Sequence, residues 1–431
     1  MQPSSNDPGG EVPTSKEIDT AILFYQEANG RVRAIEPEGQ YTARGPNGQA
    51  LTLGFMADSV TGATPNGAVP SDQTQTFVTP LKATGSTATV TSASGGSTII
   101  QLPPTPGQVA AAARQYTTAP NQLPVDRGFR DQRYAGSIGY SQPLGGISLV
   151  GAGAAYSVEH DYRSISLNTN IAQTFNLNNT TTSLAINYEN DSSFPYGGVP
   201  AGLSVMAPQW KSISSRGRSQ VDVVLGLTEV MTRNWLLQLN YSYDLSNGYQ
   251  NDPYRIISVV DPVTGEPSSY LYESRPSLRQ SQSVFFSNKL DFGPSVTTLS
   301  ARYFIDSWGI KATTVELSDR VRLAGSLYIE PDLRWSTQSA AKFFRNYLVG
   351  GQPLPEYASS DPRLGQFVGL TYGLKIGVAL TRSTELYVLG AYYQQTGNGH
   401  PADAIGQLKQ QNLFTGVNAA YVMMGYSWNF D

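Results

Sequence analysis

The stretch WLLQLNYSYDLS at residues 235–246 decides the fold, because its side chains alternate in character along the chain. Large apolar residues occupy the odd positions, namely Trp235, Leu237, Leu239, Tyr241, Tyr243 and Leu245. Polar residues fall between them, namely Gln238, Asn240, Ser242, Asp244 and Ser246. Successive residues of a strand point to opposite faces of a sheet. The stretch therefore predicts a strand with one apolar face and one face toward water.

The same alternation recurs along the chain, for example at residues 221–228, 327–335 and 368–378. Such runs reach the length of about 9 to 11 residues that a tilted strand needs to cross a bilayer. The pattern predicts sixteen strands, near residues 17–27, 31–43, 49–58, 129–142, 146–159, 162–174, 181–190, 214–229, 234–246, 279–292, 295–307, 310–321, 325–338, 365–380, 384–395 and 414–430. An even strand number suits a closed barrel of the bacterial outer membrane.

The predicted connections differ in length and alternate along the chain. Short turns fall at residues 46–48, 143–145, 176–180, 232–233, 293–294, 324–325 and 381–382. Long segments fall at residues 59–128, 191–213, 247–278, 339–364 and 396–413. A soluble β-sandwich has no reason to place every long loop at one end. The sequence thus predicts an all-β fold, a closed antiparallel transmembrane β-barrel over residues 17–431, with short periplasmic turns and long extracellular loops.

Composition agrees with a membrane barrel and excludes several other classes. The chain of 431 residues has no cysteine, so disulfides, thiolate metal sites and a cysteine nucleophile are excluded. Charged residues make up only 14%, whereas tyrosine reaches 25 residues, as suits contact with membrane lipid. The net charge is -4 and no basic cluster occurs, so nucleic acid is not an expected partner. The sequence contains no run of about twenty apolar residues, so it predicts no membrane-spanning helix.

The two ends of the chain carry different signals. Residues 1–16 are polar and rich in Pro and Gly, so we expect a flexible segment rather than a signal peptide, and a mature or clipped chain. In the last strand Val422, Met424, Tyr426, Trp428 and Phe430 share one face. A terminal strand ending in an aromatic residue resembles the signal that the outer-membrane barrel insertion machinery reads, although Asp431 follows Phe430 here. The same residues also suit an aromatic girdle at the membrane interface.

Five segments carry a specific combination of motifs. They are MADSVTGATP from Met56, GAGAAYSVEHDYRSIS from Gly151, LSNGYQNDPYR from Leu245, ARYFIDSWGIKATT from Ala301 and LRWSTQSAAKFF from Leu333. They resemble the bacterial outer-membrane family known as domain of unknown function 3570, from about Glu17 to the C-terminus. The resemblance implies an outer-membrane barrel without an established activity. The low-complexity loop at about residues 59–128 looks enlarged and weakly ordered, with a short strand possible at residues 97–102.

Charged residues on the predicted polar face are the main candidates for function. They are Glu36, Glu38, Arg133, Arg216, Arg218, Asp222, Asp244, Lys289, Arg302, Glu316, Glu330, Asp332, Arg334 and Lys375. Charges that line a wide barrel tune which solutes pass. The alternative is a cross-barrel network of ion pairs that stiffens the wall, and both roles are compatible.

A second set lies at strand ends near the outer loops. It consists of Asp58, Glu159, His160, Asp161, Asp252, Asp306 and Trp308. The turn Glu159–Asp161 offers carboxylate and imidazole ligands to a divalent cation, with Asp58, Asp252 and Asp306 converging on it. The plain alternative is a set of turn residues. Trp308 either stacks on a ligand at the barrel mouth, belongs to the outer aromatic girdle or packs under a loop.

Catalysis and cofactors have little support in the sequence. Only His160 and His400 are present as potential bases of a catalytic triad, and His400 lies in a loop expected to face solvent. No glycine-rich phosphate loop or dinucleotide fingerprint occurs. We expect a channel that passes small hydrophilic solutes through a charged lumen. The alternative is a plugged barrel that binds or scaffolds a surface or periplasmic partner, with residues 59–128 as the plug; a hydrolase is the least favoured.

Overall fold

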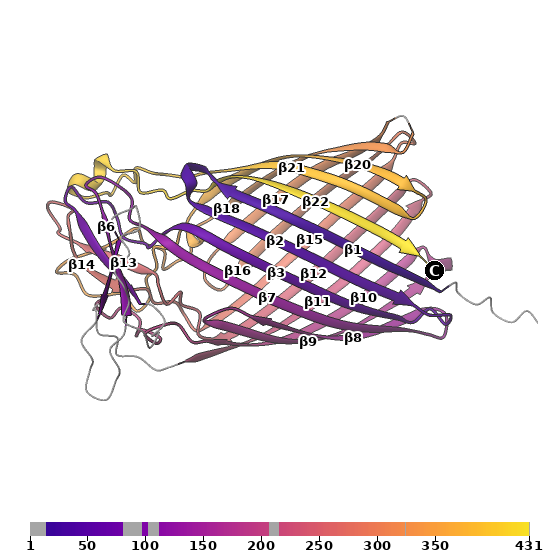
Figure 1. Cartoon of the computed structure of the whole chain (residues 1–431), viewed down its shortest axis with the longest axis horizontal. Coiled ribbons are helices and arrows are strands. Elements are labelled where there is room, and N and C mark those ends of the chain that lie inside the picture. The colour runs from indigo at the N-terminus through magenta and orange to yellow at the C-terminus, as the bar shows by residue number, and fades with distance from the viewer. Residues whose placement is uncertain (1–13, 81–96, 102–111, 207–214, 324, 431) are drawn as a thin grey trace, which may run out of the picture.

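The computed structural model describes residues 14–80, 97–101, 112–206, 215–323 and 325–430. Sixteen antiparallel strands form a closed barrel, which confirms the predicted fold class (Figure 1). The barrel closes where β1 pairs with β22, for example at Ala21 and Gly425. Its strands are β1 (Ser15–Glu27), β2 (Val32–Arg44), β3 (Ala50–Pro65), β7 (Val125–Leu144), β8 (Ser148–Val158), β9 (Tyr162–Phe175), β10 (Thr180–Ser193), β11 (Arg216–Thr232), β12 (Trp235–Gly248), β15 (Leu278–Asp291), β16 (Ser295–Asp306), β17 (Lys311–Arg322), β18 (Leu327–Gln338), β20 (Phe367–Thr381), β21 (Thr384–Thr396) and β22 (Asn418–Phe430).

The strand register separates two faces as the alternation predicts. Leu239 and Tyr241 are exposed on the outer face of β12. Asn240 and Asp244 lie on the opposite, lumenal face, where Asp244 is paired with Asp222 of β11. A belt of exposed apolar side chains around a closed barrel is stable only in contact with lipid. The protein is therefore an outer-membrane β-barrel. Among the described residues, no helix combines the length and hydropathy that a membrane-crossing helix requires.

Two strands extend further than the alternation predicts. β3 continues to Pro65 and β7 begins at Val125, and these two residues are partners in the register. The segment between them is thus residues 66–124, shorter than the predicted loop at 59–128. Asp58 lies inside β3 rather than at its end. β1 begins at Ser15, so the flexible segment expected at residues 1–16 is too long by two residues; its residues 1–13 lie outside the described residues.

The five long connections gather at one end of the barrel, beside the short connections at residues 28–31, 159–161 and 307–310, and the other short turns lie at the opposite end (Figure 1). The long connections contain two small sheets. One has the order β4-β6-β5, from β4 (Gln75–Pro80), β6 (Ala112–Thr118) and β5 (Ser97–Gln101). The other has the order β14-β13-β19, from β14 (Pro267–Tyr272), β13 (Ile256–Val260) and β19 (Leu348–Val349). β5 coincides with the short strand expected at residues 97–102, apart from Leu102, which lies outside the described residues.

We call this assembly the cap, formed by the described parts of residues 66–124, 194–215, 249–277, 339–366 and 397–417. Its apolar clusters join different loops. Phe77 and Tyr116 pack with Ile256 and Tyr272, whereas Val69 packs with Val260, Leu408 and Leu413. Ile257 and Leu271 pack with Leu348 and Ala358. Because buried apolar contacts connect the loops, the cap is a folded body and not a set of independent loops.

Short 3-10 helices complete the structure. They are η1 (Ala28–Gly30), η2 (Asn176–Asn178), η3 (Pro362–Leu364) and η4 (Gly406–Gln410). η4 lies against the turn that contains Thr264 and Gly265. Gly406 has a φ of +50°, and a Cβ there would lie 1.9 Å from the carbonyl oxygen of Thr264. Glycine is therefore required where these two cap loops meet.

Candidate functional site

The register places all of the predicted lumenal charges on one face of the barrel wall. Their partners across the strands are mostly polar or small residues, such as Ser281 opposite Asp244 and Thr314 opposite Arg302. The residues so placed are Glu36, Glu38, Arg133, Arg216, Arg218, Asp222, Asp244, Lys289, Arg302, Glu316, Glu330, Asp332, Arg334 and Lys375. The polar face that period-two alternation predicts is thus the face that encloses the lumen.

Ion pairs on this face follow the wall. Arg218 of β11 contacts Asp191 of β10 at 2.5 Å, and Arg320 of β17 contacts Glu330 of β18 at 2.9 Å. The Arg133 Nε lies 2.8 Å from Asp58 of the adjacent strand. Each ion pair between described barrel strands joins two strands that are adjacent in the wall or separated by a single strand. The pairs therefore stiffen the wall locally without crossing the lumen.

The turn between β8 and β9 brings three of the predicted rim residues together. His160 Nδ1 lies 2.8 Å from Asp131 Oδ1, and its Nε2 lies 3.6 Å from Asp161 Oδ2. The hydrogen bond with Asp131 raises the pKa of His160 above its ordinary value. Burial, together with the negative charge of Asp131, raises the pKa of Glu159 to about 7. The Tyr254 hydroxyl donates to Asp161 at 2.5 Å, which ties this turn to the cap.

The other rim carboxylates do not complete a metal site. Asp58 pairs with Arg133, and Asp306 accepts hydrogen bonds from Arg279 at 2.7 and 2.9 Å. Asp252 lies 3.6 Å from both Arg255 and Arg363, which are cap residues. Within the described part of the chain, no three His, Asp or Glu side chains form a group that could hold a metal ion. These carboxylates therefore do not converge on a site for a divalent cation. Arginine side chains neutralise them instead.

Trp308 is a packing residue at the junction of barrel and cap. Its side chain is 4% exposed and packs edge-on against Phe343 of the cap. The indole N–H donates to the Leu278 carbonyl at 3.0 Å. The guanidinium of Arg279 covers the ring at 4.5 Å from its centre. Of the three interpretations, the structure supports packing, and Trp308 acts by positioning Arg279.

A buried charge network holds two cap loops together above the lumen. Asp361 is fully buried and accepts hydrogen bonds from Arg275 at 2.8 Å and from Arg363 at 2.6 Å. Arg275 also pairs with buried Glu273 at 2.7 Å. Burial alone would raise the pKa of Asp361, but Arg255, Arg363 and Arg275 hold it well below its usual range. Burial raises the pKa of Glu273.

These arginines open onto spaces beneath the cap. A cavity of about 450 Å³ is lined by Arg218, Arg279 and Arg302 of the wall and by Arg275 and Arg363 of the cap. A second cavity of about 400 Å³ shares three of these arginines, and a third of about 640 Å³ shares Thr314 and Gln338. The shared lining residues place the three spaces next to one another. We call the first of them the arginine chamber.

Much of this chamber has no signal in the sequence. The lumenal position of Arg279 could be predicted from the alternation, because it has the same parity along β15 as the lumenal Ser281 and Ser283. Arg275 and Arg363 lie in loops that have no periodic pattern. They contact the same carboxylate although 88 residues separate them in the chain, and only the folded cap brings them together.

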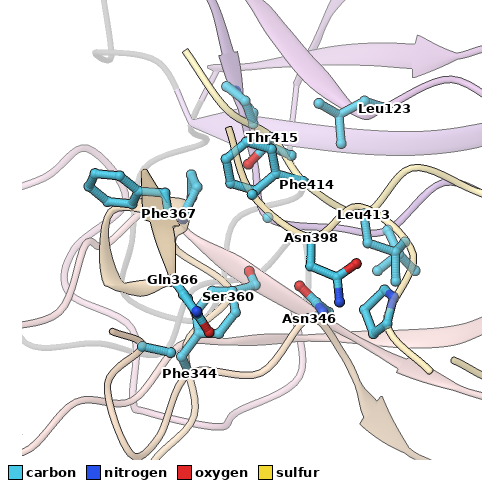
Figure 2. A pocket seen from close by; sticks show the side chains of 18 of the residues that line it. Leu123, Phe344, Asn346, Ser360, Gln366, Phe367, Asn398, Leu413, Phe414 and Thr415 are labelled. Carbon is cyan, nitrogen blue, oxygen red and sulfur yellow. The ribbon is translucent and has the colours of Figure 1, made fainter. Parts of the chain in front are cut away.

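A separate cavity of about 430 Å³ lies within the cap, next to the ends of β20 and β21 (Figure 2). Figure 2 shows aromatic and amide side chains around it, among them Phe344, Asn346, Asn398 and Phe414. They come from the β18–β20 and β21–β22 loops. This space is mainly apolar, in contrast to the arginine chamber, so it suits packing or an apolar group more than a charged solute.

Solved structures with similar backbones are bacterial outer-membrane proteins. The ferric enterobactin receptor of Pseudomonas aeruginosa matches 96% of this chain and 59% of its own, at 9% identity and a TM-score of 0.44. The siderophore receptor PirA of the same organism matches 96% and 62%, at 10% identity and 0.41. The chain thus spans about three fifths of the length of these two receptors. The outer-membrane protein OpdK of P. aeruginosa matches over 97% and 99%, at 8% identity and 0.39.

No curated protein matches the sequence. A family model described as "Protein of unknown function (DUF3570)" matches residues 3–428, nearly the whole chain. The resemblance drawn from the five motif segments is thereby confirmed. The chain, a capped sixteen-stranded barrel of the outer membrane, belongs to the DUF3570 family.

Proposed function

We propose that the protein is a channel for small hydrophilic solutes whose outer mouth is narrowed by the folded cap. The observation that carries the proposal is the charged lumenal face, whose ion pairs run along the wall. Side chains on this face are accessible: Arg334 is 53% exposed, and Arg320 and Glu316 are each 40% exposed. Exposed charged groups on the lumenal face support the proposal, because a water-filled path for small solutes requires them.

The test is conductance of the purified full chain in a planar lipid bilayer. Stepwise current increases on insertion are the expected result. A barrel that gives no current, although protease protection verifies its insertion, would overturn the channel function.

The cap gives specific support to a second function, a plugged barrel that acts as a binding protein. Its loops pack through buried apolar clusters, and residues of the cap line the spaces at the lumen mouth. The described part of residues 66–124 lies in the cap beyond the barrel end, rather than inside the lumen (Figure 1). A plug would therefore act as a lid over the mouth.

One variant separates the two functions. Pro65 and Val125 are partners in the β3–β7 register, so a two-residue Asn-Gly turn can replace residues 66–124 without disturbing the barrel. A channel with a narrowing cap gives current as the full chain and larger current after the replacement. A closed lid gives current only after the replacement. Equal current from both proteins would show that this segment does not narrow the path.

A further inference from the structure

The arginine chamber has an unusual balance of charge at its surface. Five arginines line it, and Asp361 is the one carboxylate among its lining residues. Gln250, Gln338 and Thr314 add uncharged polar groups to the same lining. The chamber has a volume of about 450 Å³, within the range of pockets that bind small molecules. The surface offered to a solute is therefore rich in donors and poor in acceptors.

Four of the five arginines already contact carboxylates, but Arg302 does not. Arg218 pairs with Asp191, Arg279 with Asp306, and both Arg275 and Arg363 with Asp361. In the part of the chain that the structure describes, Arg302 has no carboxylate within ion-pair distance and is exposed to the lumen. Its guanidinium lies 5.9 Å from the centre of the Phe304 ring. Its positive charge is thus available to a solute.

The paired arginines keep donors as well. Arg363 uses its Nε and one terminal nitrogen on Asp361, yet its side chain is 70% exposed. Arg279 directs its Nε and one terminal nitrogen to Asp306, and lies 6.0 Å from the same Phe304 ring that Arg302 approaches. Arg279 and Arg302 are therefore neighbours on the chamber wall, held by packing as well as by charge.

A guanidinium presents a planar fork of N–H donors that matches the two oxygens of a carboxylate or a phosphate. A cleft lined mainly by charge of one sign also raises the local concentration of counter-ions. We propose that the arginine chamber binds small oxyanions through Arg302, and that the channel therefore prefers anionic solutes; the second part rests on the channel function proposed above. The shared chemistry is the oxyanion, supplied either by a carboxylate or by a phosphate.

Binding is measured apart from transport, by titration calorimetry of the full chain in a non-ionic detergent. Sodium succinate and sodium phosphate are the two probes, and they distinguish the two sources of oxyanion. We expect saturable binding of at least one, and Arg302→Gln is expected to weaken it about tenfold or more, since hydrogen bonds to charged groups are the stronger ones. Lys289→Gln is the matched control, because it removes one lumenal charge near the other end of the same wall.

The outcomes separate clearly. Absence of saturable binding of both anions to the full chain, or equal weakening by Arg302→Gln and Lys289→Gln, would overturn the chamber as an anion site. Arg302→Lys keeps the charge and loses the fork, so it gives an intermediate affinity and serves if Arg302→Gln folds poorly.

Transport is tested by the reversal potential of the channel under a KCl gradient. The full chain is expected to favour chloride, and Arg302→Gln to shift the potential toward that of potassium by more than Lys289→Gln does. A silent barrel that still binds succinate or phosphate would remove the channel function and leave the binding site. A conducting barrel that binds neither anion would do the reverse.

Discussion

Asp361→Asn is the substitution expected to loosen the cap most selectively. Asp361 is fully buried, and its carboxylate accepts from Arg363 at 2.6 and 3.0 Å and from Arg275 at 2.8 Å, with Arg255 at 3.8 Å. Asparagine preserves the shape and one acceptor oxygen, but leaves these guanidinium groups without their common negative charge. The substitution therefore removes the charge together with the hydrogen bonds that one of the two oxygens accepts.

The magnitude follows from the charges that remain. Removing one partner of a buried ion pair costs about 3–5 kcal/mol. Glu273 still lies 2.7 Å from Arg275, and Asp252 still lies 3.6 Å from Arg255 and Arg363, so the lower end applies. A loss of about 3 kcal/mol corresponds to roughly hundredfold more frequent opening of the cap, because each 1.4 kcal/mol is a factor of ten.

Hydrogen exchange of the cap strands is the assay. The amides of β13 and β14 are expected to exchange about a hundredfold faster in Asp361→Asn, while those of the barrel strands are unchanged. Asp403→Asn, at an exposed cap position, is the matched control. Exchange in β13 that stays within about threefold of the rate in the unsubstituted protein would refute the reasoning.

The pH dependence of this network has a definite sign. The arginines hold the pKa of Asp361 below its usual range. A carboxylate with a depressed pKa contributes stability above its unfolded-state pKa, and that stability is lost as the pH falls through the folded-state value. Cap protection that depends on Asp361 is therefore expected to persist from neutral pH to the ordinary range of a carboxyl, and to decline only in stronger acid.

The remaining predictions concern the rim, the wall and the cap core. Asp131→Asn removes the carboxylate 2.8 Å from His160, so it should lower the raised pKa of His160 toward the ordinary value. NMR titration measures this pKa, and His400→Gln assigns the two imidazole signals. An unchanged titration of His160 would contradict the contact. Because His160 gains its partner in the folded state, the favourable contribution is present at low pH and fades as the pH rises through the raised value. Leu239→Lys on the lipid face should destabilise the barrel by about 2–4 kcal/mol, whereas Asn240→Lys on the lumenal face should destabilise it far less. Urea unfolding from lipid vesicles measures both free energies. Equal losses of stability would show that the two faces are assigned wrongly. Phe77→Ala in the cap core should lower the free energy of cap opening, measured by hydrogen exchange, by about 3–5 kcal/mol and leave the barrel intact. Faster exchange in the barrel strands as well would contradict a cap that opens separately.

The sequence by itself determined the barrel, its strand number and the identity of its two faces. A strand has a side-chain period of two, and a lipid-facing barrel must satisfy it on every strand, so the signal repeats sixteen times. That repetition located Arg302 and Asp244 on the lumenal face with no information about distant contacts. Strand ends were less determined, because the alternation loses its apolar half where the wall leaves the membrane. β3 and β7 continue past that level, which placed Asp58 inside a strand.

Only the tertiary structure decided what the loops do. Arg275, Asp361 and Arg363 belong to two loops without periodicity, and long-range burial alone gathers them over the lumen. The same burial covers Trp308, which local sequence left open between ligand contact and packing. Local patterns report how a residue faces its immediate surroundings, and a cap assembled from five distant segments depends on contacts that no local pattern encodes.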